Sequence, residues 1–279
     1  MASFSYGEGT FQSHDGLKLF YRYWAPIERR SVIIGVHGYA EHSGRYNHVG
    51  EKLASNGFAF YMHDLRGHGN SGGERGYVRS FSEFIDDLHL FMDRILEEVE
   101  EEKVFLFGHS MGGLIATIYA IEHPERLKGL ILSGPALMSG IKVSPISFVL
   151  LKIIAAIRPK YRPKIKIDAS LLTNDPEVNK AYEEDPLVFK RGTIRLLTEM
   201  LKAMDYAIAN ADKIRVPTII FHGKEDKIVP LQASQVLFDK ISIEDKELVL
   251  MDNTKHEVLN DLKKEEALNK IIQWLTKRL

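Results

Sequence analysis

The stretch that most constrains the fold of this chain is the pentapeptide Gly108-His109-Ser110-Met111-Gly112. It follows a wholly apolar run over residues 104–107 and precedes a long apolar segment that begins at residue 113. In a G-x-S-x-G motif the serine occupies a tight, strained turn between a strand and a helix, and the flanking glycines have no Cβ to collide with neighbouring backbone. The sequence therefore predicts a strand, a sharp turn and a helix here, with the Ser110 hydroxyl pointing into a cleft.

Short apolar runs and helical periodicities alternate along the rest of the chain. The short run over residues 31–36, rich in β-branched residues, is typical of a strand covered on both faces, and apolar residues at three- and four-residue steps over 81–99 indicate an amphipathic helix. Further strands are expected at 17–24, 58–62, 127–132, 216–221 and 247–250, and further helices at 44–56, 231–240 and 260–277. This alternation favours an α/β fold with a mostly parallel central sheet and helices on both faces.

One long segment, between residues 132 and 216, shows no clear strand. A connection of that length is expected to carry a function, so we interpret 137–205 as a helical cap inserted into a core of 1–136 and 206–279. A helix is expected near 193–209. The apolar run over 146–157 is too short for a bilayer, which takes roughly 20 apolar residues. That run predicts either a buried helix or an exposed surface that meets lipid through Ile146, Val149, Leu150, Ile153 and Ile154.

A reactive Ser110 needs a general base and a carboxylate that orients the base, because a serine hydroxyl is a poor nucleophile at neutral pH. In enzymes with this elbow the acid and then the histidine follow the serine along the chain. Of the eleven histidines only His123, His222 and His256 follow Ser110. His123 falls on the helix after the elbow and His222 ends a strand, whereas His256 lies in the loop before the final helix. We therefore interpret His256 as the base.

The acid is expected at the carboxyl end of a strand, where the active sites of α/β proteins gather. Asp226 follows the predicted strand 216–221 and meets this condition. Glu225 and Asp252 are the competing carboxylates. Asp252 lies just before His256 and is expected to shape that loop, so we take Asp226 as the acid.

Ester hydrolysis also needs hydrogen-bond donors aimed at the oxyanion of the tetrahedral intermediate. One backbone amide is expected from Met111, the residue after the nucleophile, and a second from the loop that follows the strand 31–36. Tyr39 occupies the place in that loop from which an amide would face the cleft.

Composition excludes several classes of function. The formal net charge of −1 gives no electrostatic case for a nucleic-acid partner, and the absence of cysteine excludes disulfides, thiolate nucleophiles and cysteine-ligated zinc. The N-terminal residues show no basic region followed by an apolar stretch, so we expect a cytoplasmic protein, with peripheral contact at a membrane as an addition.

Two further patterns are interpreted as structural. Strand ends and loops scatter histidines, so we expect no metal at His37, His42, His63 and His68. The glycine-containing loop over residues 64–71 matches neither G-x-G-x-x-G nor the P-loop pattern, and we expect a hydrogen-bonded loop packed beside the site.

Five segments together resemble the monoacylglycerol lipases of the α/β-hydrolase superfamily: HGYAEHSGRY at 37–46, DLRGHGNS at 64–71, GHSMGG at 108–113, DPL at 185–187 and HGKED at 222–226. The segment at 37–46 is far more specific to that group than the G-x-S-x-G motif, which many hydrolases share. The resemblance covers nearly the whole chain and implies an α/β-hydrolase fold. It also implies a serine hydrolase without a cofactor that releases fatty acid and glycerol from monoacylglycerols. It matches Ser110, Asp226 and His256 to the catalytic triad, and Tyr39 and Met111 to the oxyanion amides.

The resemblance further implies a polar end of the site for the glycerol, with Glu41, Arg45 and Tyr182 as candidates for substrate binding. The cap is where relatives differ most, so a preference for acyl length does not transfer. A lysophospholipase or a general carboxylesterase is the nearest alternative. A non-catalytic lipid-binding scaffold is the remote one, because such proteins usually lose a triad residue and here all three positions are filled.

Overall fold

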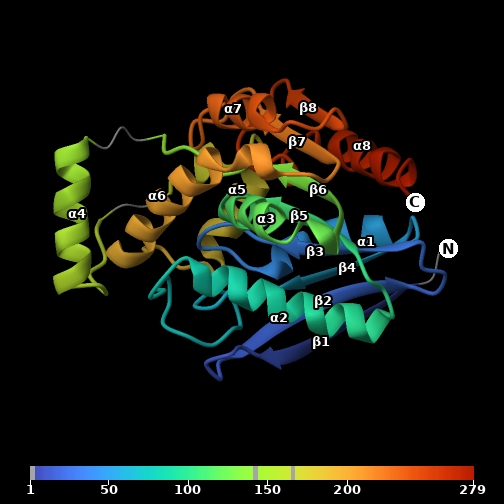
Figure 1. The fold of residues 1–279 in the computed structure, drawn as a ribbon, viewed down its shortest axis with the longest axis horizontal. Coiled ribbons are helices and arrows are strands. Elements are labelled where there is room, and N and C mark those ends of the chain that lie inside the picture. Colours follow the sequence, from blue (N-terminus) through green and yellow to red (C-terminus); the bar gives the residue numbers. More distant parts are fainter. Residues whose placement is uncertain (1–3, 141–143, 165–166) are drawn as a thin grey trace.

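A computed structural model describes residues 4–140, 144–164 and 167–279. One eight-stranded sheet crosses the molecule, with the strand order β1-β2-β4-β3-β5-β6-β7-β8 (Figure 1). The pairs β1–β2 and β2–β4 are antiparallel and every other pair is parallel. The strands are β1 (Phe4–Gln12), β2 (Lys18–Pro26), β3 (Ser31–Val36), β4 (Phe58–His63), β5 (Val104–His109), β6 (Leu127–Ser133), β7 (Thr218–Gly223) and β8 (Lys246–Met251).

Helices cover both faces of this sheet, because parallel neighbours need a crossover connection and the side chains of a strand alternate between its faces. In β3, Ile34 packs in the core shared with α2 and α3, whereas Ile33 packs in the core shared with α1 and α8. The helices are α1 (Asn47–Ala54), α2 (Ser82–Val99), α3 (Met111–Glu122), α4 (Pro145–Ile157), α5 (Pro176–Glu184), α6 (Ile194–Ala209), α7 (Gln232–Lys240) and α8 (Lys264–Thr276). The predicted α/β-hydrolase fold is confirmed.

The cap region lies between β6 and β7 and contains α4, α5 and α6. Helix α6 packs on α3 and α7, and α4 packs on α6 at the end of the molecule opposite the two termini (Figure 1). The expectation that 146–157 forms a buried helix is wrong for one side of α4, where Ile146 is 84% and Ile157 75% exposed. Ile154, expected on the exposed surface, is only half-exposed because it lies between the two sides of the helix. No helix among the described residues is long and apolar enough to cross a bilayer.

Two elements were not predicted. β1 contains Gly7 and Gly9, which lower strand propensity, but the rings of Tyr23 and Tyr21 on the neighbouring strand lie over them and replace the missing side chains. Helix α5 has a single buried residue, Tyr182, so it shows no apolar stripe. Several boundaries also shift: α1 begins at Asn47 and α8 at Lys264, later than expected, and β7 begins after Pro217, which has no N–H for the sheet.

Candidate active site

The turn between β5 and α3 holds Ser110 in a strained conformation, with φ 51° and ψ −117°. Positive φ is uncommon for a residue with a side chain and occurs mainly where surrounding structure enforces it. A Cβ at Gly108 would lie 2.4 Å from the carbonyl oxygen of Gly112, and a Cβ at Gly112 would lie 2.1 Å from that of Val36. Only glycine at both positions permits the sharp turn and the close packing of α3 against β3.

Three side chains meet at the carboxyl ends of parallel strands. Ser110 follows β5, Asp226 follows β7 and His256 follows β8. His256 Nε2 lies 2.9 Å from Ser110 Oγ, and His256 Nδ1 lies 2.7 Å from Asp226 Oδ2. An ionised carboxylate only accepts hydrogen bonds, so Nδ1 carries the ring proton and Nε2 is free to accept from the serine hydroxyl. The structure thus brings together the three residues expected to carry the reaction.

The carboxylate of Asp226 is completely shielded and fully bonded. Its Oδ1 accepts hydrogen bonds from the backbone amides of Ile228 (2.8 Å) and Val229 (2.9 Å), and His222 Nε2 lies 3.3 Å from Oδ2. The competing carboxylates lie elsewhere: Asp252 is exposed and pairs with Lys224 at 2.6 Å. Glu225 is also exposed, and its nearest polar partner is the amide of Asn174.

Electrostatics suit a proton acceptor at His256. Burial alone raises the pKa of Asp226, but the charge of His256 and hydrogen bonds from His222, His256 and Val229 outweigh it and lower that pKa. Burial alone lowers the pKa of His256, but the charge and hydrogen bond of Asp226, followed by the charges of Glu257 and Glu41, raise it. An ionised acid beside an imidazole of increased proton affinity is the arrangement that general-base catalysis uses.

The two segments expected to supply oxyanion amides both border Ser110. Met111 is the first residue of α3, where backbone N–H groups have no partner within the helix. Gly38 lies so close that a Cβ there would stand 3.2 Å from Ser110 Cβ, and its own amide donates to Glu41 Oε1 at 2.6 Å. Tyr39 follows directly, and its Oη accepts a hydrogen bond of 2.6 Å from the Gly192 amide in the cap region.

The residues expected at the polar end of the site form one buried cluster. Arg45 Nη1 donates to Glu41 Oε2 at 2.6 Å, and the Arg45 guanidinium lies 4.8 Å from the centre of the Tyr182 ring. Arg45 also makes a bidentate pair with Glu257, at 2.6 and 2.7 Å. Burial alone raises the pKa of Glu41, but the Arg45 charge lowers it to about 2. Glu257 was not predicted, although its position directly after His256 was a usable signal.

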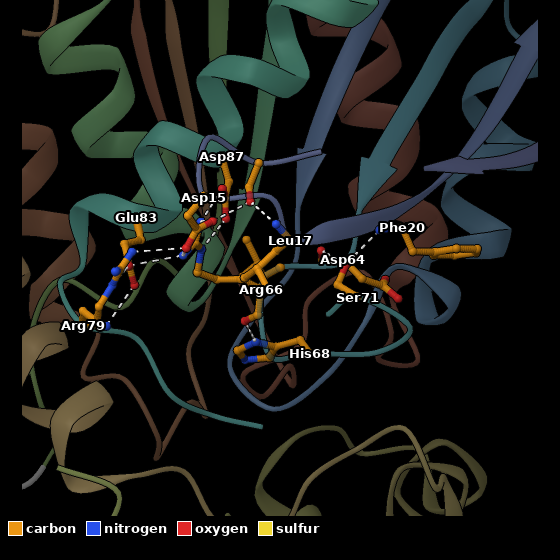
Figure 2. A network of polar contacts seen from close by, with 12 residues as sticks. Asp15, Leu17, Phe20, Asp64, Arg66, His68, Ser71, Arg79, Glu83 and Asp87 are labelled. Atoms are coloured by element: carbon orange, nitrogen blue, oxygen red, sulfur yellow. Dashed lines mark hydrogen bonds and ion pairs between the residues drawn. The ribbon is translucent and has the colours of Figure 1, made fainter. Parts of the chain in front are cut away.

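The loop over residues 64–71 is held by hydrogen bonds and ion pairs (Figure 2). Asp64 accepts from the amides of Ser43 and Asn70, both at 2.7 Å. Arg66 makes a bidentate pair with Asp87 on α2, at 2.6 and 2.7 Å, and also binds Asp15. This network ties the loop to the sheet and to α2 beside the site.

Of the four histidines near the site, His37, His42 and His68 bond to protein atoms, whereas neither ring nitrogen of His63 has a hydrogen-bond partner. His37 Nδ1 lies 2.8 Å from the Gly38 carbonyl, and its Nε2 accepts from the Leu65 amide at 2.9 Å. His42 Nε2 lies 2.8 Å from Asp185 Oδ2 in the cap region. Within the parts of the chain that the structure describes, no three His, Cys, Asp or Glu side chains group as metal ligands.

A cavity of about 640 Å³ opens between the cap region and the core. One of its lining residues, Leu137, directly follows Ala136, whose amide donates to the Ser110 carbonyl at 3.0 Å. Most of its lining is apolar and comes from α4, α6 and α7, including Phe148, Leu201, Met204, Ile208 and Val236.

An eight-stranded sheet with a serine elbow, a buried acid and a histidine at its carboxyl edge defines the α/β-hydrolase class. The profile of the family described as serine aminopeptidase, S33, matches residues 27–263. A monoacylglycerol lipase of Mycolicibacterium smegmatis is 32% identical over the whole of both chains. A phospholipase of Bacillus subtilis is 29% identical over 88% of this chain and 94% of its own. The crystal structure of a monoacylglycerol lipase from Paleococcus ferrophilus superposes with a TM-score of 0.83 at 32% identity, covering 99% of this chain and 100% of that one.

The chain therefore belongs to the serine aminopeptidase S33 family of α/β-hydrolases, among its members that resemble monoacylglycerol lipases. This confirms the resemblance inferred from the five sequence segments and places the protein with the lipases and esterases.

Proposed function

We propose that the protein hydrolyses the ester bond of monoacylglycerols to a fatty acid and glycerol, with Ser110 as nucleophile, His256 as general base and Asp226 as the acid that orients it. The continuous chain of contacts from Ser110 Oγ through His256 to Asp226 carries this proposal. Ser110 Oγ attacks the ester carbonyl carbon as His256 takes its proton. His256 then gives the proton to the glycerol oxygen as the ester C–O bond breaks. Water, deprotonated by His256, then attacks the acyl-enzyme, and His256 gives that proton to Ser110 Oγ as the bond to the acyl carbon breaks and the fatty acid leaves.

The backbone amides of Met111 and Tyr39 are proposed to stabilise the oxyanion in both half-reactions. Loss of one such donor typically costs about 3–4 kcal/mol of transition-state stabilisation. The short contact between the Gly38 position and Ser110 supports this role, because it brings the loop that carries Tyr39 against the nucleophile.

Two features and the similarity to named relatives support this substrate class. The apolar cavity beneath α4 and α6 suits an acyl chain, and we propose that it takes that part of the substrate. Glu41, Arg45 and Tyr182 are proposed to form the wall toward the glycerol. The family relatives named as monoacylglycerol lipases, at 32% identity, support the same substrate. The proposed steps need no cofactor.

We propose residues 137–205 as the cap that roofs this site, with 1–136 and 206–279 as the core, although α6 continues past the second boundary to Ala209. Long-chain monoacylglycerols reside in lipid aggregates, so the cap is also proposed as the part of the protein that meets lipid.

A fluorophosphonate probe tests the reaction directly. We expect one covalent adduct per chain, at Ser110, and loss of both labelling and ester turnover in Ser110→Ala. The matched control is Ser82→Ala, an exposed serine at the start of α2, which should keep both. Labelling that survives in Ser110→Ala would refute the assignment. If the parent protein reacts with the probe but the untreated protein turns over no ester, the non-catalytic scaffold would be favoured.

Lysophospholipid hydrolysis is the second candidate, favoured by the similarity to the Bacillus subtilis phospholipase. Initial rates on a monoacylglycerol, a lysophosphatidylcholine of the same acyl chain and a short p-nitrophenyl ester separate the possibilities. The proposal predicts the highest kcat/KM for the monoacylglycerol. Preference for the lysophospholipid or the short ester would instead identify a lysophospholipase or a general carboxylesterase.

A further inference from the structure

We infer that His222 is a positioning residue for the proposed catalysis: it holds the turn that carries Asp226, and Ser234 on α7 fixes the orientation and the tautomer of its ring. The inference rests on the proposed function, because it assigns a role behind the same triad. His222 is the second-to-last residue of β7, four positions before Asp226, and its side chain is completely buried.

Both ring nitrogens of His222 have a protein partner. Nδ1 lies 2.7 Å from Ser234 Oγ, while Nε2 lies 3.1 Å from the Val229 carbonyl oxygen and 3.3 Å from Asp226 Oδ2. The carbonyl and the ionised carboxylate only accept hydrogen bonds, so the ring proton is on Nε2. Nδ1 therefore accepts from the Ser234 hydroxyl, and the ring is neutral with both nitrogens bonded.

These contacts hold a turn as well as the carboxylate. Asp226 Oδ1 accepts from the amides of Ile228 and Val229, so residues 226–229 and the carboxylate form one closed unit. The His222 ring touches this unit at both ends, at the Val229 carbonyl and at Asp226 Oδ2. Because Ser234 lies on α7, which packs on β7 and β8, the ring ties the unit to the core of the fold.

His222 and His256 approach the same carboxylate oxygen but have different partners beyond it. His256 Nδ1 lies 2.7 Å from Asp226 Oδ2, and its Nε2 faces Ser110. The nitrogens of His222 are engaged by Ser234 and by the turn, so neither is free to take a proton from the nucleophile. Burying an imidazole and a hydroxyl costs free energy that two apolar side chains would avoid. A role in holding Asp226 explains why this pair is there.

The position of the carboxylate matters for the base. Burial alone lowers the pKa of His256, and the charge and hydrogen bond of Asp226 are the largest causes that raise it. A carboxylate that moves away from Nδ1 lowers this pKa and orients the ring less well. Loss of His222 should therefore lower kcat and move the acidic limb of the kcat/KM profile to lower pH. The other titratable groups that face His256 stay unchanged in the variants below: Glu41, Glu257 and His109.

Variants at the two positions test the inference on a soluble p-nitrophenyl ester. His222→Leu keeps a side chain of similar size without a donor, and we expect kcat to fall roughly 10- to 100-fold, with the acidic limb at lower pH. His222→Gln places an amide N–H near the position of Nε2 and should restore most of the rate and of the limb. Ser234→Ala leaves the ring unfixed and should cause a smaller change in the same direction. The double variant His222→Leu/Ser234→Ala should equal His222→Leu, because Ser234 acts through the ring.

The downfield proton NMR signal of His256 Nδ1–H reports the contact with Asp226 directly and needs no substrate. We expect this signal in the parent and in His222→Gln, and a displaced or broadened signal in His222→Leu. The matched control is His63→Leu, which removes an equally buried imidazole from the end of β4. It should keep both the acidic limb and the signal.

An unmoved acidic limb and an unchanged signal in His222→Leu would overturn the inference and leave His222 as a structural residue. A limb at higher pH would overturn it as well, because His222 would then compete with His256 for the carboxylate. If His222→Leu does not fold, a limb and a signal of Ser234→Ala that equal those of the parent overturn it. Absence of ester turnover by the parent would contradict the proposed function instead, and the NMR comparison would still decide whether His222 positions Asp226.

Discussion

The residues of the candidate site differ in how well their roles can be predicted from the neighbouring sequence. Ser110, Asp226 and His256 were predictable because each has a local signature: an elbow, or a loop directly after an apolar strand, in a fixed order along the chain. Glu257 directly follows His256, but nothing in its local sequence indicates its partner. Its partner Arg45 lies 212 positions away, so only the folded chain shows that the two side chains meet.

The pH dependence of turnover tests whether Glu257 acts on His256. The Glu257 charge is one of the causes that raise the pKa of His256, after the charge and hydrogen bond of Asp226. Because the general base must be unprotonated, removing that charge in Glu257→Gln should move the acidic limb of the kcat/KM profile to lower pH. Initial rates on a soluble ester between pH 4 and 9 provide the measurement.

The control for this prediction is Glu225→Gln, an exposed carboxylate in the neighbouring loop. It should leave the acidic limb in place. A lower kcat for Glu257→Gln with an unmoved acidic limb would mean that Glu257 only supports the loop and does not influence proton affinity at His256.

At the level of elements, hydrophobic periodicity predicted the helices and strands that pack on the central sheet. It failed where tertiary contacts replace periodicity: aromatic rings of β2 cover the glycines of β1, and polar contacts hold α5. For α4 the sequence predicted an apolar helix but not its surroundings, because exposure depends on which elements pack against it.

Thr193 joins the start of α6 to the core by hydrogen bonds. Its Oγ1 donates to the Gly76 carbonyl at 2.8 Å and accepts from the Leu196 amide at the start of the helix, while its own amide donates to Gly76 as well. Thr193→Val keeps the shape but removes both hydroxyl contacts, so we expect a loss of about 1–2 kcal/mol in stability. Hydrogen exchange should be faster in the first turns of α6.

Thr276→Val is the matched control, because its exposed hydroxyl donates only to a carbonyl within α8. Its free energy of unfolding should change by less than about 0.5 kcal/mol. Unchanged exchange in α6 of Thr193→Val would show that other contacts hold the cap region to the core.

For the whole molecule, the buried imidazoles at the end of β4 and in the loop that follows it predict a dependence of stability on pH. Both ring nitrogens of His63 are buried without a hydrogen-bond partner, and the imidazole packs against the rings of Phe11 and Phe91. Burial, then the charge of His37, lowers the pKa of His63 to about 3, and burial lowers that of His68 to about 3 as well. The unfolded chain, with ordinary histidines near pH 6.5, therefore binds more protons than the folded protein between pH 6.5 and 3.

Stability must consequently fall as pH decreases through that window, and it is fully present above it. Replacing His63 by phenylalanine removes one of the groups responsible, so the slope of unfolding free energy against pH should decrease, by about 1.4 kcal/mol per pH unit below about pH 5.5, where the unfolded histidine is almost fully protonated. Urea unfolding at pH 7.0, 5.5 and 4.5 measures this slope. The larger phenylalanine ring can overpack the site and lower stability at every pH, but such a loss does not change the slope. His14→Gln, at an exposed position, should keep the parent slope. An equal slope in His63→Phe would mean that His63 is protonated within the fold.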